Sequence, residues 1–431
     1  MVPLVQPFWV HSGMTISSRE AEEALKHVDT CKEIPMSTPP NDFDKVLQSK
    51  LSGRIAGLLN RARIERTWSN DFEPSPIQPD RDVFLLPTGM AAIYFVHTCL
   101  LKWRSSASKA ILLGVPYQST PYILKTFGAG MEELGLGTEY DDIENFVKAE
   151  ADAGRPVTAV WTEFPSNPLL VSSDLNRLRQ LADKYNFAIV VDDTVGSFSN
   201  IDVLPVVDIV VTSLTKSFSG YADVMGGSVV LNPSSPLANT LRSYFHKSYH
   251  NYVYDEDMRT LLKNSDDYLE RSKIYNDNAN GLVKYLHDLT KDPNSPVSKV
   301  FYPSVAPTVS NYQAFMRPKT SDFTPGYGCL FNVEFDSMDS MIAFYDNLRV
   351  HHGPHLGAHR TLALPYTKML FIKNAEEVKK WDLYPSQIRV SVGLEPFEEL
   401  EVAFKYALQK ADEAKRKLSA DGVNGQVNGQ S

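Results

Sequence analysis

Residues 188–227 read AIVVDDTVGSFSNIDVLPVVDIVVTSLTKSFSGYADVMGG, and this stretch decides the fold. It holds two apolar runs rich in Val and Ile, and a third, GGSVVLN, overlaps its end. Short runs of this kind are typical of strands that are covered on both faces of a parallel sheet. Polar residues follow the first two runs, among them Asp192, Ser213 and Lys216. Because ligands bind beyond the carboxyl ends of such strands, these side chains are candidates for a functional site.

Lys216 stands just after an apolar strand, where partial desolvation would lower the pKa of its amine. Such an amine is suited to form a Schiff base with an aldehyde. The alternative is an ordinary surface lysine on a loop. Asp192 ends a neighbouring strand, where its carboxylate can pair with a pyridinium nitrogen. A lysine and an aspartate in these roles are what proteins usually provide for pyridoxal 5′-phosphate (PLP).

The stretch VVDDTVGS followed by TSLTKSFSGYADVMGG resembles the VDNT…S-x-TK…G-x-x-D-x-x-GG pattern of the Cys/Met-metabolism PLP-dependent enzymes, the family of cystathionine γ-synthase. Further matches extend from about residue 85 to about residue 410. The resemblance implies an α/β protein of PLP fold type I, which is aspartate-aminotransferase-like. Its large domain would hold a mostly parallel, seven-stranded sheet, and a smaller α/β domain would follow. It also implies a PLP-dependent transferase that works as a homotetramer, a dimer of dimers.

Composition narrows the class of protein further. The chain has 431 residues, 43% of them apolar, which is enough for a sizeable core and more than one domain. Its net charge of −9, without a basic block, argues against nucleic acid as a partner. Cys31, Cys99 and Cys329 lie far apart, as expected of reduced thiols in a cytoplasmic protein. We expect no signal peptide, membrane span or metal site.

We expect four parts along the chain. These are an N-terminal arm and helix (1–70), a PLP-binding large domain (71–280), a C-terminal small domain (281–418) and a disordered, Gly/Asn-rich tail (419–431). The arm contains a helical pattern whose apolar residues would share one face: Val46, Leu47, Leu51, Ile55, Leu58 and Leu59.

In the family such an arm clasps a neighbouring subunit and usually carries a Tyr-x-Arg motif that reaches the neighbour's cofactor phosphate. The motif is absent from this chain. Arg63 and Arg66 are possible substitutes, although either could be an ordinary basic residue at a helix end.

Thr88-Gly89-Met90 is expected to open a helix that runs to about Trp103. A helix N-terminus presents free N–H groups and a positive dipole end to a phosphate, although Thr-Gly could also be a plain helix cap. The segment resembles the family's S-G-M-A-A turn, which implies that Gly89 and Met90 bind the phosphate through their backbone. By the same resemblance, Ser213 and Thr215 would donate hydrogen bonds to phosphate oxygens.

Tyr117 is followed by Thr120 and Tyr122 at the spacing of the family's Tyr-Gly-Gly-Thr-Tyr motif, although Gln118 and Ser119 replace both glycines. The resemblance places the Tyr117 ring on the face of the cofactor, where an aromatic ring suits a planar pyridine. The alternative is a tyrosine in the core.

Three further residues are assigned by resemblance. PSNP at 165–168 matches E-T-P-S-N-P, so Asn167 would bond to the phenolic oxygen of the cofactor, with Glu163 at the preceding strand end. Thr194 stands where the family has a threonine under the ring. Asp193 replaces the asparagine of VDNT, which adds a second acid of unassigned role.

Two motifs near the C-terminus imply a substrate site. IRVSVGLE resembles R-L-S-V-G-I-E, so Arg389 would grip the α-carboxylate of the substrate with paired hydrogen bonds, unless it simply faces solvent. GPHLGAHRTLALPYT resembles P-S-L-G-x-x-x-[S/T]-L, so Thr361 would help to hold that carboxylate. The residue before it is Arg360, where many synthases have Glu, and His355 replaces a serine.

The resemblance implies γ-replacement on an O-acyl-L-homoserine, with Lys216 as the catalytic base and Tyr117 assisting the leaving group. Because Arg360 exchanges an acid for a base, we expect an incoming carbon nucleophile with a carboxylate, such as acetoacetate. The product would be an amino-oxo acid of the 2-amino-6-oxoheptanoate type. The alternatives are a cystathionine γ-synthase that uses L-cysteine, a γ-lyase of the same family, and a non-catalytic PLP-fold scaffold subunit.

Overall fold

The structure is a computed structural model that describes residues 2–30, 44–64 and 75–427. Its chain divides into two compact units. Unit 1 comprises Met1–Asn167, Val171–Glu270 and Ser310–Pro325, and unit 2 comprises Pro168–Leu170, Arg271–Val309 and Gly326–Ser431.

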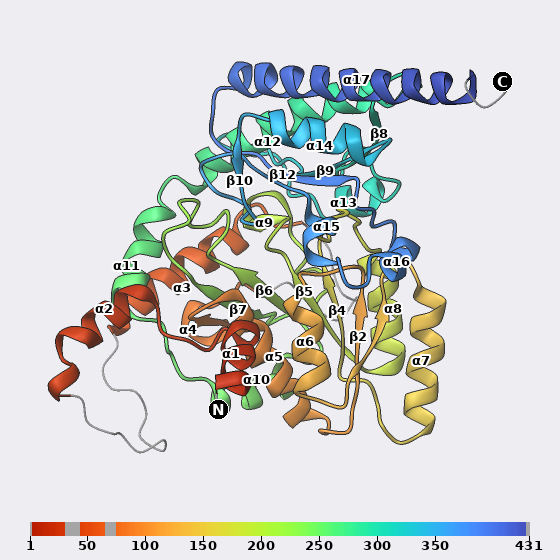
Figure 1. Cartoon of the computed structure of the whole chain (residues 1–431). Coiled ribbons are helices and arrows are strands. Elements are labelled where there is room, and N and C mark those ends of the chain that lie inside the picture. Colours follow the sequence, from red (N-terminus) through yellow and green to blue (C-terminus); the bar gives the residue numbers. More distant parts are fainter. Residues whose placement is uncertain (1, 31–43, 65–74, 428–431) are drawn as a thin grey trace. The chain divides into compact units, whose positions relative to one another are not determined.

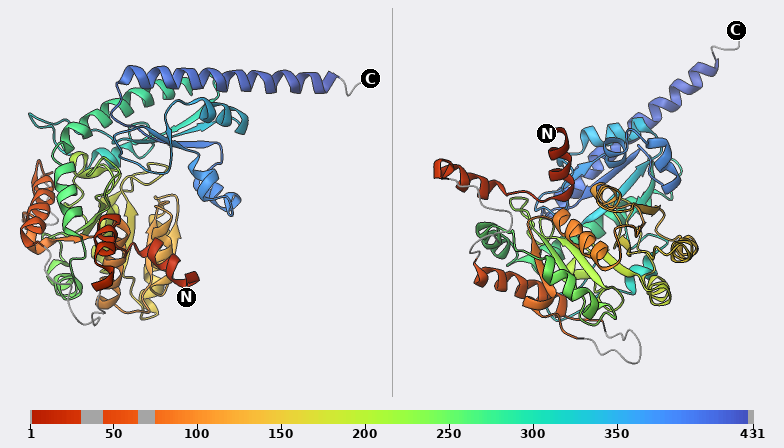
Figure 2. Two further views of the ribbon diagram at one scale, coloured as in Figure 1. Left: turned by 60° about the vertical axis from the view of Figure 1, so that its left-hand side comes forward. Right: turned by 90° about the horizontal axis from the view of Figure 1, so that it is seen from below.

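Unit 1 is built on one large sheet with helices on both faces (Figures 1 and 2). Its strands are β1 (Val83–Leu86), β2 (Ala110–Leu113), β3 (Met131–Leu134), β4 (Ala159–Glu163), β5 (Ala188–Asp192), β6 (Ile209–Ser213) and β7 (Gly227–Leu231). Its helices up to β4 are α1 (Val2–Ser12), α2 (Ser18–Lys26), α3 (Lys45–Asn60), α4 (Pro79–Asp82), α5 (Gly89–Trp103), α6 (Ser119–Thr126) and α7 (Tyr140–Asp152). After β4 come α8 (Leu175–Tyr185), α9 (Ser197–Asn200), α10 (Ala238–Ser248) and α11 (Asp255–Asn264).

The strand order of this seven-stranded sheet is β1-β7-β6-β5-β4-β2-β3. Strand β7 runs antiparallel to both of its neighbours, and the pairs from β6 through β3 are all parallel. The expected large, mostly parallel sheet is therefore confirmed. The parallel pairing of β5 with β6 brings the carboxyl ends of both strands to one edge, where the predicted site residues stand.

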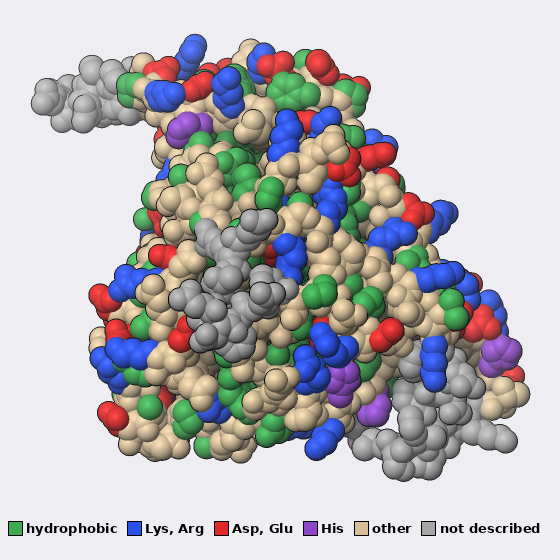
Figure 3. Space-filling model, turned by 180° about the vertical axis from the view of Figure 1, so that it is seen from behind, with side chains coloured by type: hydrophobic (Ala, Val, Ile, Leu, Met, Phe, Trp, Pro, Cys, Tyr) green, Lys and Arg blue, Asp and Glu red, His purple; other side chains and the backbone are tan. Residues whose placement is uncertain are grey.

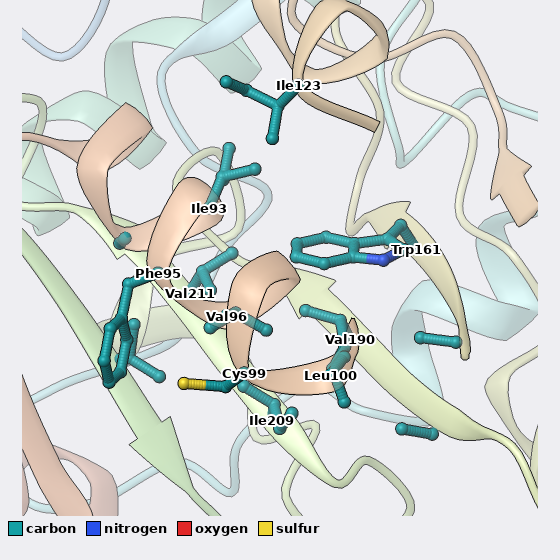
Figure 4. Close-up of a cluster of buried hydrophobic side chains, with 14 of the residues drawn as sticks. Ile93, Phe95, Val96, Cys99, Leu100, Ile123, Trp161, Val190, Ile209 and Val211 are labelled. Atoms are coloured by element: carbon teal, nitrogen blue, oxygen red, sulfur yellow. The ribbon is translucent and has the colours of Figure 1, made fainter. Parts of the chain in front are cut away.

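Alternation along the strands builds the core, because successive side chains point to opposite faces of a sheet. Val190, Ile209 and Val211 share one face with Trp161 and pack against residues of α5 such as Val96 (Figure 4). The intervening residues, such as Ile189 and Val191, are also fully buried. Both faces of the sheet are covered, which explains why its strands read as unbroken apolar runs.

The helix expected in the arm is α3, and most of its predicted apolar face is buried. Leu47, Leu51, Ile55 and Leu59 are at most 6% exposed. Leu58 is half-buried, and Val46 is 60% exposed, so the prediction that Val46 shares the apolar face was wrong. It lies two residues after the N-cap Asp44, in the first turn of the helix.

Unit 2 holds a smaller sheet in the order β10-β11-β12-β9-β8. Its strands are β8 (Val297–Phe301), β9 (Leu330–Phe335), β10 (His351–His352), β11 (Leu362–Leu364) and β12 (Gln387–Ser391), and its helices α14 (Met338–Asn347), α15 (Tyr366–Leu370), α16 (Ala375–Val378) and α17 (Phe397–Val427). A core of apolar side chains from β9, β12, α14 and α17 fills it. The expected smaller C-terminal α/β part is present.

Three helices bear on the expected boundaries. Helix α12 (Tyr268–Leu289) carries the chain from unit 1 into unit 2, and the expected boundary at residue 280 falls inside it. Short helix α13 (Val309–Gln313) returns the chain to unit 1. Helix α17 continues through residues 419–427, where we expected a disordered tail. Each added residue of a helix gains a backbone hydrogen bond, so an established helix can extend through a polar segment.

No helix among the described residues is long and apolar enough to cross a membrane, nor do those residues contain a metal-binding cluster. Cys99 and Cys329 are buried free thiols, and Cys31 lies outside the described residues. On the face drawn in Figure 3, Lys and Arg side chains are interspersed with Asp and Glu.

Replacing Phe344 by Ala should destabilise unit 2. This ring is fully buried and lies 4.8 Å from the ring of Phe335 and 5.8 Å from that of Phe404, centroid to centroid. The cavity should cost about 3–5 kcal/mol of unfolding free energy in urea titrations. Ile342→Ala on the same helix is the matched control, because Ile342 is 39% exposed. Equal losses in both variants would contradict this view of the core.

Candidate active site

The carboxyl ends of β5 and β6 are joined by hydrogen bonds through three predicted site residues. The Thr194 N–H donates to Oδ1 of Asp192 at 2.9 Å. The Ser213 N–H donates to Oγ1 of Thr194 at 2.8 Å. The structure thus brings Asp192, Thr194 and Ser213 together as expected, and Thr194 is the link between them.

Lys216 follows in the turn after β6, held by backbone bonds from its own N–H to Ser213 O and from the Gly220 N–H to its carbonyl. Burial raises the pKa of Asp192 above its ordinary value, while the Thr194 hydrogen bonds and the positive charge of Lys216 act in the opposite direction. A cationic ring nitrogen beside this carboxyl would further favour its ionised form. Asp192 and Lys216 therefore fit a pyridinium ring at this edge of the sheet.

The first turn of α5 forms a cradle for an anion. Thr88 is the N-cap, since its Oγ1 accepts the Ala91 N–H at 2.9 Å and its carbonyl accepts that of Ala92. The first N–H groups of a helix have no partner inside the helix, so those of Gly89 and Met90 can bind a ligand. A Cβ on Gly89 would stand 2.7 Å from Cβ of Ser213, so only glycine lets this turn reach the end of β6. These donors fit a phosphate group.

Thr215 has a different set of partners from the one expected. Its hydroxyl accepts the Gly226 N–H at 3.1 Å and donates to the Gly226 carbonyl at 3.3 Å. The side chain therefore fastens the loop between β6 and β7. Its hydroxyl proton is used in this bond, and donation to a phosphate stays a prediction.

Glu163, at the end of β4, holds two of the predicted loops. Its Oε1 accepts the Tyr117 N–H at 2.5 Å, and its Oε2 accepts the Asn167 N–H at 3.0 Å. The Tyr117 ring is 41% exposed, so the alternative of a core tyrosine is wrong. A pocket at this edge is lined by Thr120, Glu163 and Asp192 among others, which places the Tyr117 loop near the end of β5.

In unit 2, Arg389 lies on β12 and is only 3% exposed, so the solvent-facing alternative is wrong. Its guanidinium carbon lies 4.4 Å from the ring centroid of Tyr366, and Nη2 donates to the Pro354 carbonyl. The planar guanidinium is thereby fixed in one orientation, as recognition of a carboxylate by two hydrogen bonds requires.

Thr361 is fully buried and its hydroxyl is engaged within the protein. It donates to Oε2 of Glu395 at 2.8 Å and accepts the Gly393 N–H at 2.9 Å. These two bonds occupy the Thr361 hydroxyl, and its contact with a substrate carboxylate stays a prediction. Thr361 fixes the backbone next to Arg360, because the Thr361 N–H also donates to Glu395.

Arg360 is exposed, and His355 is half-buried on the same connection between β10 and β11. This connection is fastened to β12 and the segment after it. Its Gly357 N–H donates to Ser391 Oγ at 2.9 Å, and its His359 carbonyl accepts the Leu394 N–H. Arg360 and Arg389 are thus held by one packed unit.

The proposed substitutes for Tyr-x-Arg gain no support. Arg63 donates to the Ser75 carbonyl at 2.8 Å, and Arg66 lies outside the described residues.

Asp193, to which no sequence motif assigns a role, fixes a turn at this edge of the sheet. Its carboxylate is 2% exposed and accepts a 2.5 Å hydrogen bond from Thr212 Oγ1, while its N–H donates to Val211 O. It therefore fixes the turn after β5 to β6. Burial raises its pKa to about 7, the Thr212 hydrogen bond opposes this, and the charge of Asp192 adds to it. Buried Arg317 also acts on Asp193 by its charge.

A model of the family described as Cys/Met metabolism PLP-dependent enzyme matches residues 77–409. The chain is 37% identical, over 94% of its length, to alanine racemase ungC of Aspergillus violaceofuscus, of which the match covers 71%. It is 35% identical, over 96% of its length, to cystathionine gamma-synthase-like enzyme iboG2 of Amanita muscaria, of which 75% is covered. The solved structure of cystathionine gamma-lyase from Lactobacillus plantarum aligns with a TM-score of 0.65 and 21% identity, covering 88% of this chain and 91% of that one.

Asp193 should make stability fall as pH rises. In the folded chain its pKa is raised to about 7, so it keeps a proton that the unfolded chain releases near pH 4. Between about pH 5 and about pH 8 the wild type should therefore lose about 3 kcal/mol more unfolding free energy than Asp193→Asn. Urea unfolding of both apoproteins at the two pH values measures this. Parallel pH profiles would show that Asp193 is ionised in the folded protein.

Proposed function

Because the chain belongs to the Cys/Met-metabolism family of enzymes that depend on pyridoxal 5′-phosphate, we propose that it catalyses γ-replacement on an O-acyl-L-homoserine. The acyl group would be acetyl, and the incoming group a carbon nucleophile such as acetoacetate. The new bond joins the carbon between the two carbonyls to Cγ, acetate leaves, and loss of CO₂ gives 2-amino-6-oxoheptanoate. We also propose that the active form is a homotetramer, a dimer of dimers.

When bound, the cofactor supplies an electron sink for the carbanion at Cα. Lys216 would hold it through its aldehyde and, once displaced by the substrate amine, would remove and return the Cα proton. Asp192 would keep the ring nitrogen protonated. The Gly89 and Met90 N–H groups and the Ser213 hydroxyl would hold the phosphate, Asn167 would bond to the phenolic oxygen, and the Tyr117 ring would cover the cofactor face.

The residues that we propose for substrate recognition, Arg389 and Arg360, belong to unit 2. Arg389, buried and oriented by Tyr366, would bind the α-carboxylate of the homoserine ester. Arg360 would select the nucleophile. It is an exposed cation, and its backbone is held in place by the hydrogen bond from the Thr361 N–H to Glu395. A cation favours an incoming carboxylate over an incoming ammonium group by simple charge attraction.

Products would decide between this proposal and its alternatives. The purified protein with PLP would receive O-acetyl-L-homoserine alone, with acetoacetate, or with L-cysteine, and mass spectrometry would identify the products. An amino-oxo acid in the acetoacetate tube supports the proposal. Cystathionine only in the cysteine tube indicates a cystathionine γ-synthase, and ammonia and a keto acid without nucleophile indicate a γ-lyase. A protein that binds PLP and yields no product from any amino acid tested, including L-alanine, would be a scaffold subunit.

One relative is named as an alanine racemase, so the product assay includes a fourth reaction, with L-alanine. Alanine racemase ungC is 37% identical to this chain. Racemisation needs only removal and return of the Cα proton, which Lys216 could perform without any leaving group at Cγ. L-Alanine alone would therefore be tested by chiral chromatography, and D-alanine as the main product would overturn γ-replacement.

Arg360→Glu should lower kcat/KM for acetoacetate by about tenfold or more, because repulsion replaces an attraction of roughly 1 kcal/mol. Turnover of O-acetyl-L-homoserine without nucleophile should change little. Lys368→Glu, the same charge reversal at an exposed residue of α15, is the matched control. An unchanged kcat/KM for acetoacetate in Arg360→Glu would show that Arg360 does not select the nucleophile.

Lys216→Ala should abolish both turnover and the visible absorption that PLP gains on forming a Schiff base with a lysine. Tight PLP binding should persist in part, because the phosphate contacts lie on other residues. An unchanged absorption spectrum would mean that a different lysine holds the cofactor.

A further inference from the structure

The N-terminal segment lies against the turn that holds the candidate phosphate site. Helix α1 ends at Ser12, which is fully buried, and the chain then turns at Gly13 with φ +64°. The Gly13 carbonyl accepts a hydrogen bond from Thr88 Oγ1 at 3.1 Å. Thr88 Oγ1 in turn accepts a hydrogen bond from the Ala91 N–H in the first turn of α5. The N-cap of α5 is thus held from outside by residue 13.

The contact at Gly13 leaves no room for a side chain. A Cβ there would stand 2.0 Å from Thr88 Oγ1 and 2.9 Å from the Ala91 nitrogen. The positive φ also favours glycine. The positive φ and the close approach to Thr88 therefore both require glycine at position 13.

Further residues of the segment bridge α5 to α6. The Phe8 ring meets those of Tyr94 on α5 and Phe127 after α6 edge-on, with centroids 6.2 and 5.9 Å apart. His11 stacks on Tyr122, with centroids 3.9 Å apart, and its Nδ1 lies 3.1 Å from Ser119 Oγ. Ser119 is one of the residues that replace the family's glycines after Tyr117, so this replacement has a partner in the N-terminal segment.

We propose that residues 8–14 form a strap that positions the phosphate-binding turn of the same chain, with Gly13 acting through Thr88. The strap itself donates nothing to the phosphate. It keeps the Thr88 hydroxyl between Gly13 and Ala91, so that the N–H groups of Gly89 and Met90 keep one direction. The inference rests on the assignment of the phosphate to Gly89, Met90 and Ser213.

A strap that positions the phosphate-binding turn should affect binding of the cofactor's phosphate and not binding of its ring. The test compares PLP with pyridoxal, which lacks the phosphate, by titrating each into apoprotein and following the visible absorption. In Gly13→Ala the Kd of PLP should rise about tenfold, as for loss of a cap, and that of pyridoxal should stay within about twofold. Gly57→Ala is the matched control, because nothing lies within 4 Å of a Cβ at that position.

His11→Ala is the second variant, since it keeps the backbone at residue 13 and serves if Gly13→Ala fails to fold. It should raise the Kd of PLP by about threefold and leave the Kd of pyridoxal nearly unchanged. Equal weakening of PLP and pyridoxal, or no change in either, would overturn the strap. If wild-type protein binds PLP no better than pyridoxal, the phosphate assignment itself fails, which is a separate outcome.

Discussion

The close approach of three backbone segments at the start of α5 is the constraint on which the site depends. Gly89 lies against Ser213 at the end of β6, and a Cβ on Gly227 would stand only 2.1 Å from the Thr88 carbonyl oxygen. Side chains at either glycine would push the helix away from the sheet. Because these residues lack a Cβ, the helix N-terminus and the hydroxyl of Ser213 can serve one anion, while Lys216 follows within a turn of the same strand end.

The residues around this turn divide into those that can touch a ligand and those that hold them. Glu163 uses both carboxylate oxygens on the N–H groups of Tyr117 and Asn167. Thr194 joins Asp192 to Ser213, and Asp193 joins the same turn to Thr212. Buried polar groups must find partners, so each such bond also fixes the loop that makes it. The loops of unit 1 are in this way oriented by side chains of the strand ends.

The sequence predicted the parallel sheet, the α5 turn and the meeting of Asp192 and Ser213 at one edge of the sheet, because apolar runs, caps and motif spacing are local patterns. It did not predict that Thr361 and Thr215 would use their hydroxyls on Glu395 and Gly226, since a motif names a residue but not its hydrogen-bond partner. The contact of Gly13 with Thr88 was also beyond reach. It joins positions 75 residues apart, and Gly13 belongs to no pattern that marks it as more than a turn.

The strand order sets a sequence of events during synthesis. Strand β1 pairs with β7, which is made about 140 residues later, so β1 cannot join the sheet until Gly227–Leu231 has left the ribosome. The strap, Thr88 and α5 all precede that point and can associate early. The cradle is therefore completed last from its C-terminal side, and a nascent chain gains the ability to retain its cofactor only after most of unit 1 exists.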